Sequence, residues 1–328
     1  MTGFNAAQLT RRLLCALPMA ALALAPLQAQ AKYPDKPVKM ILPFGPGGVA
    51  DVTSRILADR LEKKLGQRFI IENMPGPGGI NAARAVTTAV PDGYTIGLIT
   101  NGTAISVAAF KKLPFDPLKD FEMISGLGQF NLLLAVDANS KYKTVKDFIA
   151  DVDANPGKLN IGAIVVGSTQ DLGAELLKSS ANLNVSIVPF KNSPDVLVSL
   201  LRNDVQMVVD FPPALKGQVT AGKLRVLAST GPKREPDMKD VPTVAEVVPG
   251  YEVTSWNGVF APKGVPNEVV DTLGKAMKEV LADPEVKAQF EKVGVEAHSS
   301  SPQELIDRTT SDIKKWNAVI DKAGIERK

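Results

Sequence analysis

The chain has 328 residues, of which 45% are hydrophobic and 22% are charged, the balance of an ordinary globular protein. This length exceeds what one hydrophobic core usually serves, so we expect two lobes. The formal net charge of +3 falls to +1 once the two arginines of a predicted leader are removed. A nearly neutral surface gives no reason to expect nucleic acid or an anionic membrane as a partner.

Residues 1–31 are predicted to be a cleaved secretory signal peptide. Arg11-Arg12 precedes an apolar run, Leu13–Leu27, that is too short and too interrupted by proline to remain as a transmembrane helix. Ala29-Gln30-Ala31 provides a small-x-small cleavage site. The arginine pair also suits a twin-arginine leader, but such pairs occur in ordinary leaders too. We therefore expect export to the periplasm by the Sec route rather than by Tat.

The first elements along the mature chain alternate between strand and helix. Apolar runs at 38–43, 68–72 and 94–100 are typical of buried strands, and helical spacing predicts helices over 50–65 and 80–90. Gly-rich turns at 45–48 and 76–79 follow the first two strands. This alternation predicts a parallel, doubly wound sheet.

The pattern restarts after residue 130. The expected strands are 132–136, 159–164, 186–190, 206–211 and 224–229, and the expected helices are 144–154, 169–180, 194–203 and 214–221. An extended stretch at 251–262 precedes helices at 267–281, 284–293 and 302–323.

A first lobe that begins at residue 33 has too few helices to cover its sheet, so we expect the C-terminal helices to return to it. The predicted lobes are 32–129 with 255–328, and 130–254. The chain then crosses between them twice, near residues 128–131 and 250–256. Two crossovers make a hinge with a ligand cleft between the lobes.

The residue types that metal and nucleophile chemistry needs are scarce. Cys15, the single cysteine, lies in the leader. His298, the single histidine, has no second histidine or thiol to complete a zinc site and no Gly-x-Ser-x-Gly motif to complete a triad, so we expect it on the surface. Gly45, Gly47 and Ala50 fit a loose dinucleotide fingerprint, but the proline between the two glycines has no N–H to offer a phosphate. No metal and no cofactor are therefore expected.

The strongest binding motif is the turn Pro43–Asp51, between the first strand and the first helix. Its glycines let a ligand approach the backbone closely, and the helix N-terminus adds the positive end of a dipole. Together they predict an anion site without a fixed cation. The expected ligand-binding residues of this turn are Phe44, Gly45, Pro46, Gly47, Gly48 and Asp51. A tight turn capped by Asp51 is the structural alternative.

Other candidate residues follow other strands. Asn101, after the third strand, is placed to line the cleft. In the second lobe, Gly167 and Ser168 open a helix and offer N–H groups and a hydroxyl. Asp210 ends an apolar strand, where a carboxylate needs a partner or a wet site, and a helix cap is its alternative role. Trp256 either stacks on a ligand or fills the hinge.

A series of short motifs extends along the chain in a characteristic order. They are Tyr33-Pro34, Lys36-Pro37, Pro43–Asp51, Glu72–Gly79, Pro91–Thr95, Leu113–Pro117, Lys119–Phe121, Pro156–Asn160, Val241–Glu246, Trp256–Gly258 and Ala261-Pro262. In this order and spacing, over residues 33–326, the chain resembles the receptors of tripartite tricarboxylate transporters, the Bug and TctC-like periplasmic binding proteins.

This resemblance implies an α/β fold of two lobes, the type II or Venus-flytrap fold, with a doubly wound sheet in each lobe and a double-crossover hinge. It also implies a carboxylated ligand and the membrane permease of a tripartite tricarboxylate transporter as partners. In that family, backbone N–H groups, hydroxyls and water hold the ligand carboxylate, and this role carries over to Phe44–Asp51, Gly167 and Ser168. We therefore expect a monomeric periplasmic receptor that is not an enzyme.

Two departures from the family bear on the ligand. Asp171 stands where the family often has histidine, and Phe190-Lys191-Asn192 where it has Tyr-Lys-Gly. An acid near the second-lobe loop would repel a second ligand carboxylate and favour a monocarboxylate, an amino acid or an aromatic acid. If Asp171 only stabilises the start of the helix, it would not discriminate between these ligand classes. A periplasmic sensor is the alternative function. A lyase or decarboxylase is less favoured because catalytic groups are scarce.

Overall fold

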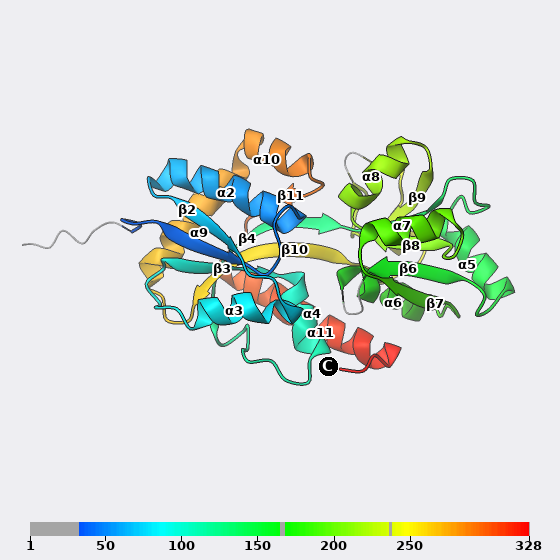
Figure 1. Ribbon diagram of the computed structural model, residues 1–328, viewed down its shortest axis with the longest axis horizontal. Helices are drawn as coiled ribbons and strands as arrows, with labels where there is room; N and C mark the ends of the chain where they lie inside the picture. The colour runs from blue at the N-terminus through cyan, green and yellow to red at the C-terminus, as the bar shows by residue number, and fades with distance from the viewer. Residues whose placement is uncertain (1–32, 165–167, 236–237, 328) are drawn as a thin grey trace, which may run out of the picture.

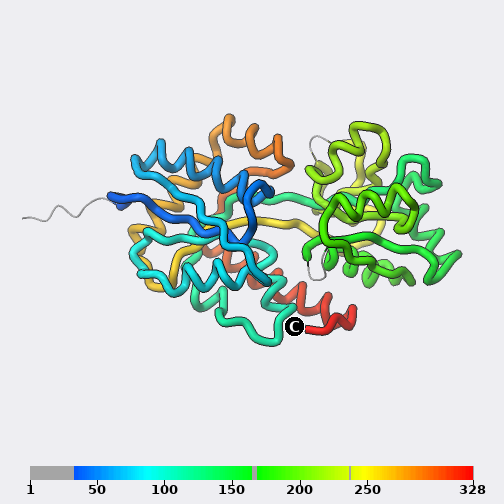
Figure 2. Tube along the Cα trace, in the orientation of Figure 1, coloured from blue at the N-terminus to red at the C-terminus, as the bar shows by residue number. Residues whose placement is uncertain are grey.

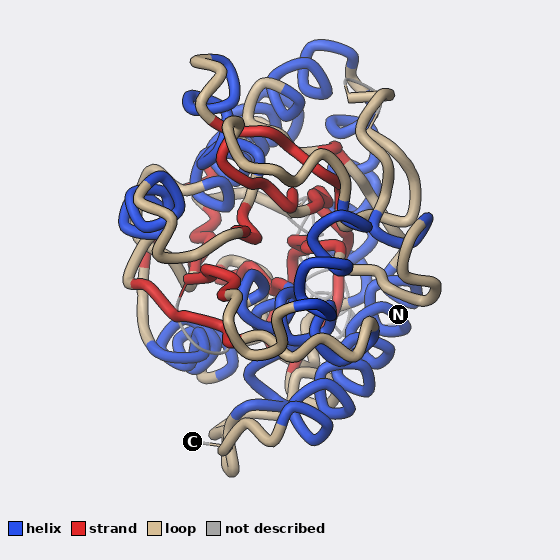
Figure 3. The backbone as a smooth tube through the Cα atoms, turned by 90° about the vertical axis from the view of Figure 1, so that its right-hand side faces the viewer, coloured by secondary structure: helices blue, strands red, loops and turns tan. Residues whose placement is uncertain are grey.

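The computed structural model describes residues 33–164, 168–235 and 238–327, and within them the strands form two separate sheets. The sheets lie in two lobes at opposite ends of the elongated molecule (Figure 1). Viewed along the long axis, the helices surround the strands (Figure 3). The predicted signal peptide and Gly167 lie outside the described residues.

The first lobe holds a six-stranded mixed sheet in the order β11-β4-β10-β3-β1-β2. Its strands are β1 (Val38–Leu42), β2 (Phe69–Asn73), β3 (Thr95–Thr100), β4 (Phe121–Asn131), β10 (Thr254–Pro262) and β11 (Glu296–Ala297). The helices around it are α2 (Val49–Leu65), α3 (Ile80–Thr87), α9 (Asn267–Ala282) and α10 (Pro284–Glu291), with a 3₁₀ turn, η1 (Pro77–Gly79). Because β1, β2 and β3 are parallel, their carboxyl ends meet at one edge of the sheet.

The second lobe holds a five-stranded mixed sheet in the order β7-β6-β8-β5-β9. Its strands are β5 (Leu133–Asp137), β6 (Asn160–Ile164), β7 (Ser186–Phe190), β8 (Met207–Asp210) and β9 (Leu224–Ser229). Its helices are α5 (Val145–Ala154), α6 (Thr169–Ser180), α7 (Ser193–Leu201) and α8 (Pro212–Thr220), with a 3₁₀ turn, η2 (Val244–Glu246). A capping box begins α5, because Thr144 N donates to Asp147 Oδ2 at 2.8 Å and Asp147 N donates to Thr144 Oγ1 at 3.2 Å.

Two adjacent segments connect the lobes. Leu132 alone separates β4 from β5, so the chain leaves the first sheet and enters the second within one residue. The return path enters β10, whose Thr254 pairs with Asn131 of β4. The two crossing segments therefore lie side by side, as the tube view also shows (Figure 2).

Helix α11 (Pro302–Ala323) packs against both lobes. It lies on α4 (Asn101–Ala109) in the first lobe and on α6 in the second. Trp316, Val319 and Ile320 of α11 belong to the same buried apolar cluster as the core of the second lobe. Helix α11 therefore contributes to the core of the second lobe in addition to covering the first sheet.

The apolar patterns did not predict β4 and α4. The apolar run of β4 is interrupted by Glu122, Ser125, Gly126 and Gly128. The strand is stabilised instead by pairing with β10 on one side and with β11 on the other. Asn101 lies in the first turn of α4, which begins directly after β3 without a connecting loop.

Candidate functional site

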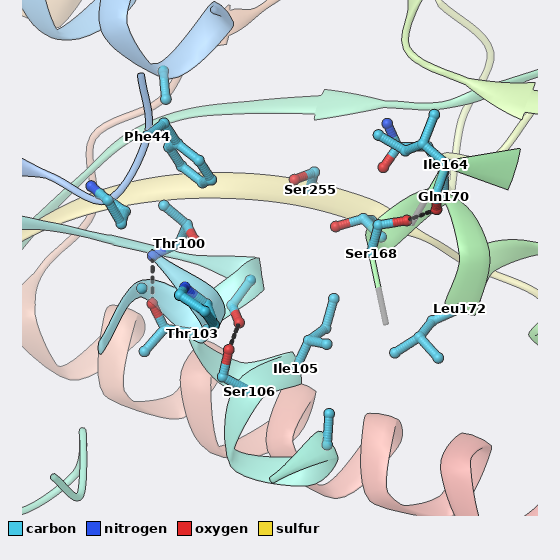
Figure 4. A pocket seen from close by; sticks show the side chains of 18 of the residues that line it. Phe44, Thr100, Thr103, Ile105, Ser106, Ile164, Ser168, Gln170, Leu172 and Ser255 are labelled. Atoms are coloured by element: carbon cyan, nitrogen blue, oxygen red, sulfur yellow. Dashed lines mark hydrogen bonds between the residues drawn. The ribbon is translucent and has the colours of Figure 1, made fainter. Parts of the chain in front are cut away.

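A cavity of about 720 Å³ lies between the two lobes. From the first lobe it is lined by Phe44, Gly48 and Thr100 among others, and from the second by Ser168 and Gln170. Ser255, on the connecting strand β10, lies between the two groups, and the ring of Phe44 extends into the space (Figure 4). Both lobes therefore supply the cavity walls.

Three helix N-termini meet at this cavity. Helix α2 begins after Gly48, α4 after Thr100 and α6 after Ser168, and all three of these N-cap residues line the cavity. The first N–H groups of a helix lack partners within the helix, and its dipole places partial positive charge there. Strands β1 and β3 are neighbours in the sheet. From β1 the chain continues to β2 on one side, and from β3 it continues to β4 on the other side, so α2 and α4 also flank a topological switch point.

The turn before α2 leaves the backbone at Gly48 open to the cavity. Gly47 has φ of +88°, a left-handed conformation that favours glycine. Gly48 is the N-cap of α2, and no side chain caps the helix there. A Cβ added at Gly48 would meet no atom within 4 Å, because open space lies in front of it. A ligand can therefore approach this backbone closely.

The side chain of Asp51 stabilises the turn before α2 by hydrogen bonding. Its carboxylate is buried and accepts hydrogen bonds from Gly47 N at 2.9 Å, from two nitrogens of Arg55 at 2.9 and 3.0 Å, and from Asn73 Nδ2 at 2.9 Å. These bonds, above all those from Arg55, lower the pKa of Asp51 to about 2 despite burial. Asp51 does not line the cavity, so its geometry matches the capping alternative.

The walls of the cavity are largely apolar. Four phenylalanines line it (Phe44, Phe110, Phe130 and Phe211), together with aliphatic side chains such as Leu172. Among the described lining residues there is no lysine, arginine or histidine. A bound anion would therefore have to be stabilised by N–H dipoles and hydroxyls, and its remaining atoms would contact hydrocarbon.

The second-lobe residues form a hydrogen-bonded wall. Ser168 Oγ donates to Ile164 O at 2.6 Å and accepts from Asp171 N at 3.1 Å, which caps α6. Asp210 is buried, and its Oδ1 accepts from Gln170 Nε2 at 3.1 Å and from Phe211 N at 2.8 Å. Asp210 thus bonds to the backbone N–H directly before α8, whose N-cap residue, Phe211, supplies no side-chain cap of its own.

The predicted residues occupy three kinds of position. Phe44, Gly48 and Ser168 line the cavity. Gly45, Pro46 and Gly47 form the adjoining turn, and Asp51, Asn101, Asp171 and Asp210 are buried without being part of the lining. Asn101 joins helices instead, since its amide bonds to Thr169 and to Trp316.

The apolar patterns missed lining residues that carry polar or charged side chains, namely Thr100, Ser106, Gln170, Ser255, Asn257 and Glu326. Alternation along β10 was the available signal, because residues two apart in a strand share a face. Trp256 lies between the two lining residues of β10 and does not line the cavity. Its Nε1 donates to buried Asp312 at 2.6 Å.

Neither a metal centre nor a membrane span is found in the part of the chain that the structure describes. No three histidine, cysteine, aspartate or glutamate side chains cluster there in a way that could hold an ion. No described helix is both long and apolar enough to cross a bilayer.

Comparison with known proteins agrees with this architecture. The family model described as a tripartite tricarboxylate transporter family receptor matches residues 53–325. The chain belongs to this family. A Cupriavidus necator member, described as the UPF0065 protein in the gbd 5′ region, is 35% identical over 307 residues, which cover 93% of each chain.

Two solved structures share the fold over nearly their whole length. R. palustris Rpa4515 with adipate has a TM-score of 0.78 and 33% identity, covering 90% of this chain and 99% of its own. MatC from Rhodopseudomonas palustris with bound malate has a TM-score of 0.73 and 29% identity, covering 88% and 100%. The predicted two-lobed periplasmic binding protein fold is confirmed.

Proposed function

We propose that this receptor captures a small carboxylated organic acid in the cavity between its lobes and delivers it to the membrane permease of a tripartite tricarboxylate transporter. It acts in the periplasm as a monomer, and it acts by binding alone rather than by catalysis. One ligand occupies each chain.

One observation carries this proposal: the N-termini of α2, α4 and α6 converge on one cavity with no cationic side chain in its described lining. Such a site stabilises a single carboxylate by N–H groups without attracting every anion in solution. The adipate and malate named with two related structures are both carboxylates, which supports the same ligand class.

The apolar walls narrow the expected ligand further. A carboxylate placed at the N-termini of α2 and α4 leaves the rest of the molecule against Phe44 and the other aromatic rings. A second negatively charged group there would lose its hydration without gaining a cationic side chain as a partner. We therefore expect an acid with an apolar body to bind better than a compact polyacid.

A thermal-shift experiment on the mature protein tests the proposal. Hexanoate, benzoate, adipate and malate are compared with hexanamide, which matches hexanoate in size but carries no charge. A ligand at about 100 times its Kd raises the unfolding free energy by roughly 2.7 kcal/mol, so the melting temperature should rise for at least one acid and not for the amide. An equal rise with hexanamide would refute an anion site.

Delivery to the permease needs a separate measurement. Uptake of the best radiolabelled acid is followed in cells that carry the permease with and without this receptor. Uptake that does not depend on the receptor would argue for the sensor alternative.

A further inference from the structure

Asn257 has a buried side-chain amide without a protein partner. The residue is only 3% exposed, and its Nδ2 atom makes no hydrogen bond. Its Oδ1 makes no hydrogen bond among the described residues either, but unlike Nδ2 this oxygen keeps some exposed surface. Leaving a buried amide unpaired costs free energy, so such a group in a folded protein calls for an explanation.

The place of Asn257 in the fold supplies that explanation. It lies on β10, where it pairs with Thr100 of β3, the N-cap of α4. Side chains of such a cross-strand pair stand on the same face of the sheet, and both residues line the cavity. The free amide therefore stands beside a helix N-terminus at the switch point.

Rotation of the amide about its last side-chain bond exchanges the positions of nitrogen and oxygen. Asn257 can thus present either a donor or an acceptor to the cavity. Beside the N-terminus of α4, where the local potential favours an anion, the donor is the useful choice. A carboxylate oxygen would satisfy the amide and be satisfied by it.

We propose that Asn257 is a ligand-binding residue whose amide NH₂ donates to the acid group held at the N-termini of α2 and α4. This inference rests on the proposed function and adds a specific contact to it. Since β10 is one of the two strands that connect the lobes, the bond also ties the ligand to the hinge.

Three variants separate the possibilities. Asn257→Leu keeps the branching of the side-chain heavy atoms and removes hydrogen bonding, whereas Asn257→Asp keeps the shape and leaves only an acceptor. Thr254→Val is the matched control, because Thr254 lies on the same strand, is also buried with an unpartnered Oγ1, and does not line the cavity.

The measurement is isothermal titration of each variant with the acid that shifts the wild type most in the panel of hexanoate, benzoate, adipate and malate. Losing a hydrogen bond to a charged group weakens binding about 10- to 100-fold, which is the effect expected for Asn257→Leu. Asn257→Asp should bind still more weakly because like charges repel, and Thr254→Val should change the Kd less than about threefold.

The ligand-free melting temperature distinguishes a binding role from a structural one. Asn257→Leu removes an unpaired buried group, so it should melt at or above the wild-type temperature while losing affinity. Unchanged affinity in Asn257→Leu, or wild-type affinity in Asn257→Asp, would overturn the inference. A wild type that none of the acids stabilises would instead refute the proposed function.

Discussion

Trp316 Nε1 donates to Asn101 Oδ1 at 2.9 Å, and Asn101 Nδ2 in turn donates to Thr169 Oγ1 at 3.2 Å. All three residues are buried, and they come from α11, α4 and α6. This chain of bonds therefore joins the C-terminal helix to the helices that open toward the cavity from each lobe.

Breaking this connection should destabilise the protein measurably. Trp316→Phe leaves the Asn101 acceptor buried and unpaired, which costs about 1–3 kcal/mol. Urea unfolding of Trp316→Phe, Asn101→Leu and the double variant checks this in a mutant cycle. The double variant should cost less than the two single costs together, and strictly additive costs would show that the bond contributes nothing.

Filling the space in front of the α2 N-terminus should block the ligand. Gly48→Leu introduces no backbone strain, since a Cβ there meets no atom and φ is −78°. The melting temperature should stay near that of wild type while affinity for the best acid falls at least about tenfold, because the N–H groups are covered. Gly217→Leu in α8, also in open space but outside the cavity lining, is the control. Wild-type affinity in Gly48→Leu would place the anion elsewhere.

Removing the Phe44 ring should weaken the binding of apolar acids selectively. Phe44 is 42% exposed and its ring extends into the cavity, so a ligand body can bury it. Phe44→Ala should lower hexanoate affinity by about tenfold, the effect of about 1.4 kcal/mol of lost apolar burial, with little change in stability. Val198→Ala, at an exposed apolar position on α7, should change neither. Equal losses for hexanoate and malate would argue against an apolar wall.

The bonds to Asp51 predict a pH dependence of stability. Because the folded pKa, about 2, lies below the ordinary value of 3.8, the carboxylate stabilises the folded protein above pH 4. Asp51→Asn should therefore cost about 2 kcal/mol at pH 7, and this difference from wild type should shrink as pH falls from about 4 to 2. Thermal unfolding of both proteins across that range provides the test, and a constant difference down to pH 2 would contradict it.

Asp171 lies in the first turn of α6, is buried, and is not part of the cavity lining. We therefore expect it to act as a helix-start residue rather than as a filter against a second ligand carboxylate. Asp171→Asn should leave the ratio of hexanoate to adipate affinities unchanged in titration calorimetry. A shift of that ratio toward adipate would show that the Asp171 charge reaches the ligand.

The amino-acid sequence alone determined the order of elements and the place of the main turn. Apolar runs and helical spacing predicted β1, α2 and most later elements within a few residues, since these patterns reflect which face of a segment is buried. The glycines before α2 indicated an approachable helix N-terminus, and the order of short motifs indicated the family.

Only the tertiary structure decided which polar side chains meet. Asn257 and Thr100 lie far apart in the sequence and become neighbours through the pairing of β10 with β3. Asp51 suits a ligand site by its position after the glycines, but its bonds to Arg55 and Asn73 turn it toward the protein. The physical reason is that hydrophobic patterns specify burial along one segment, whereas the partner of a polar group depends on which other segments pack beside it.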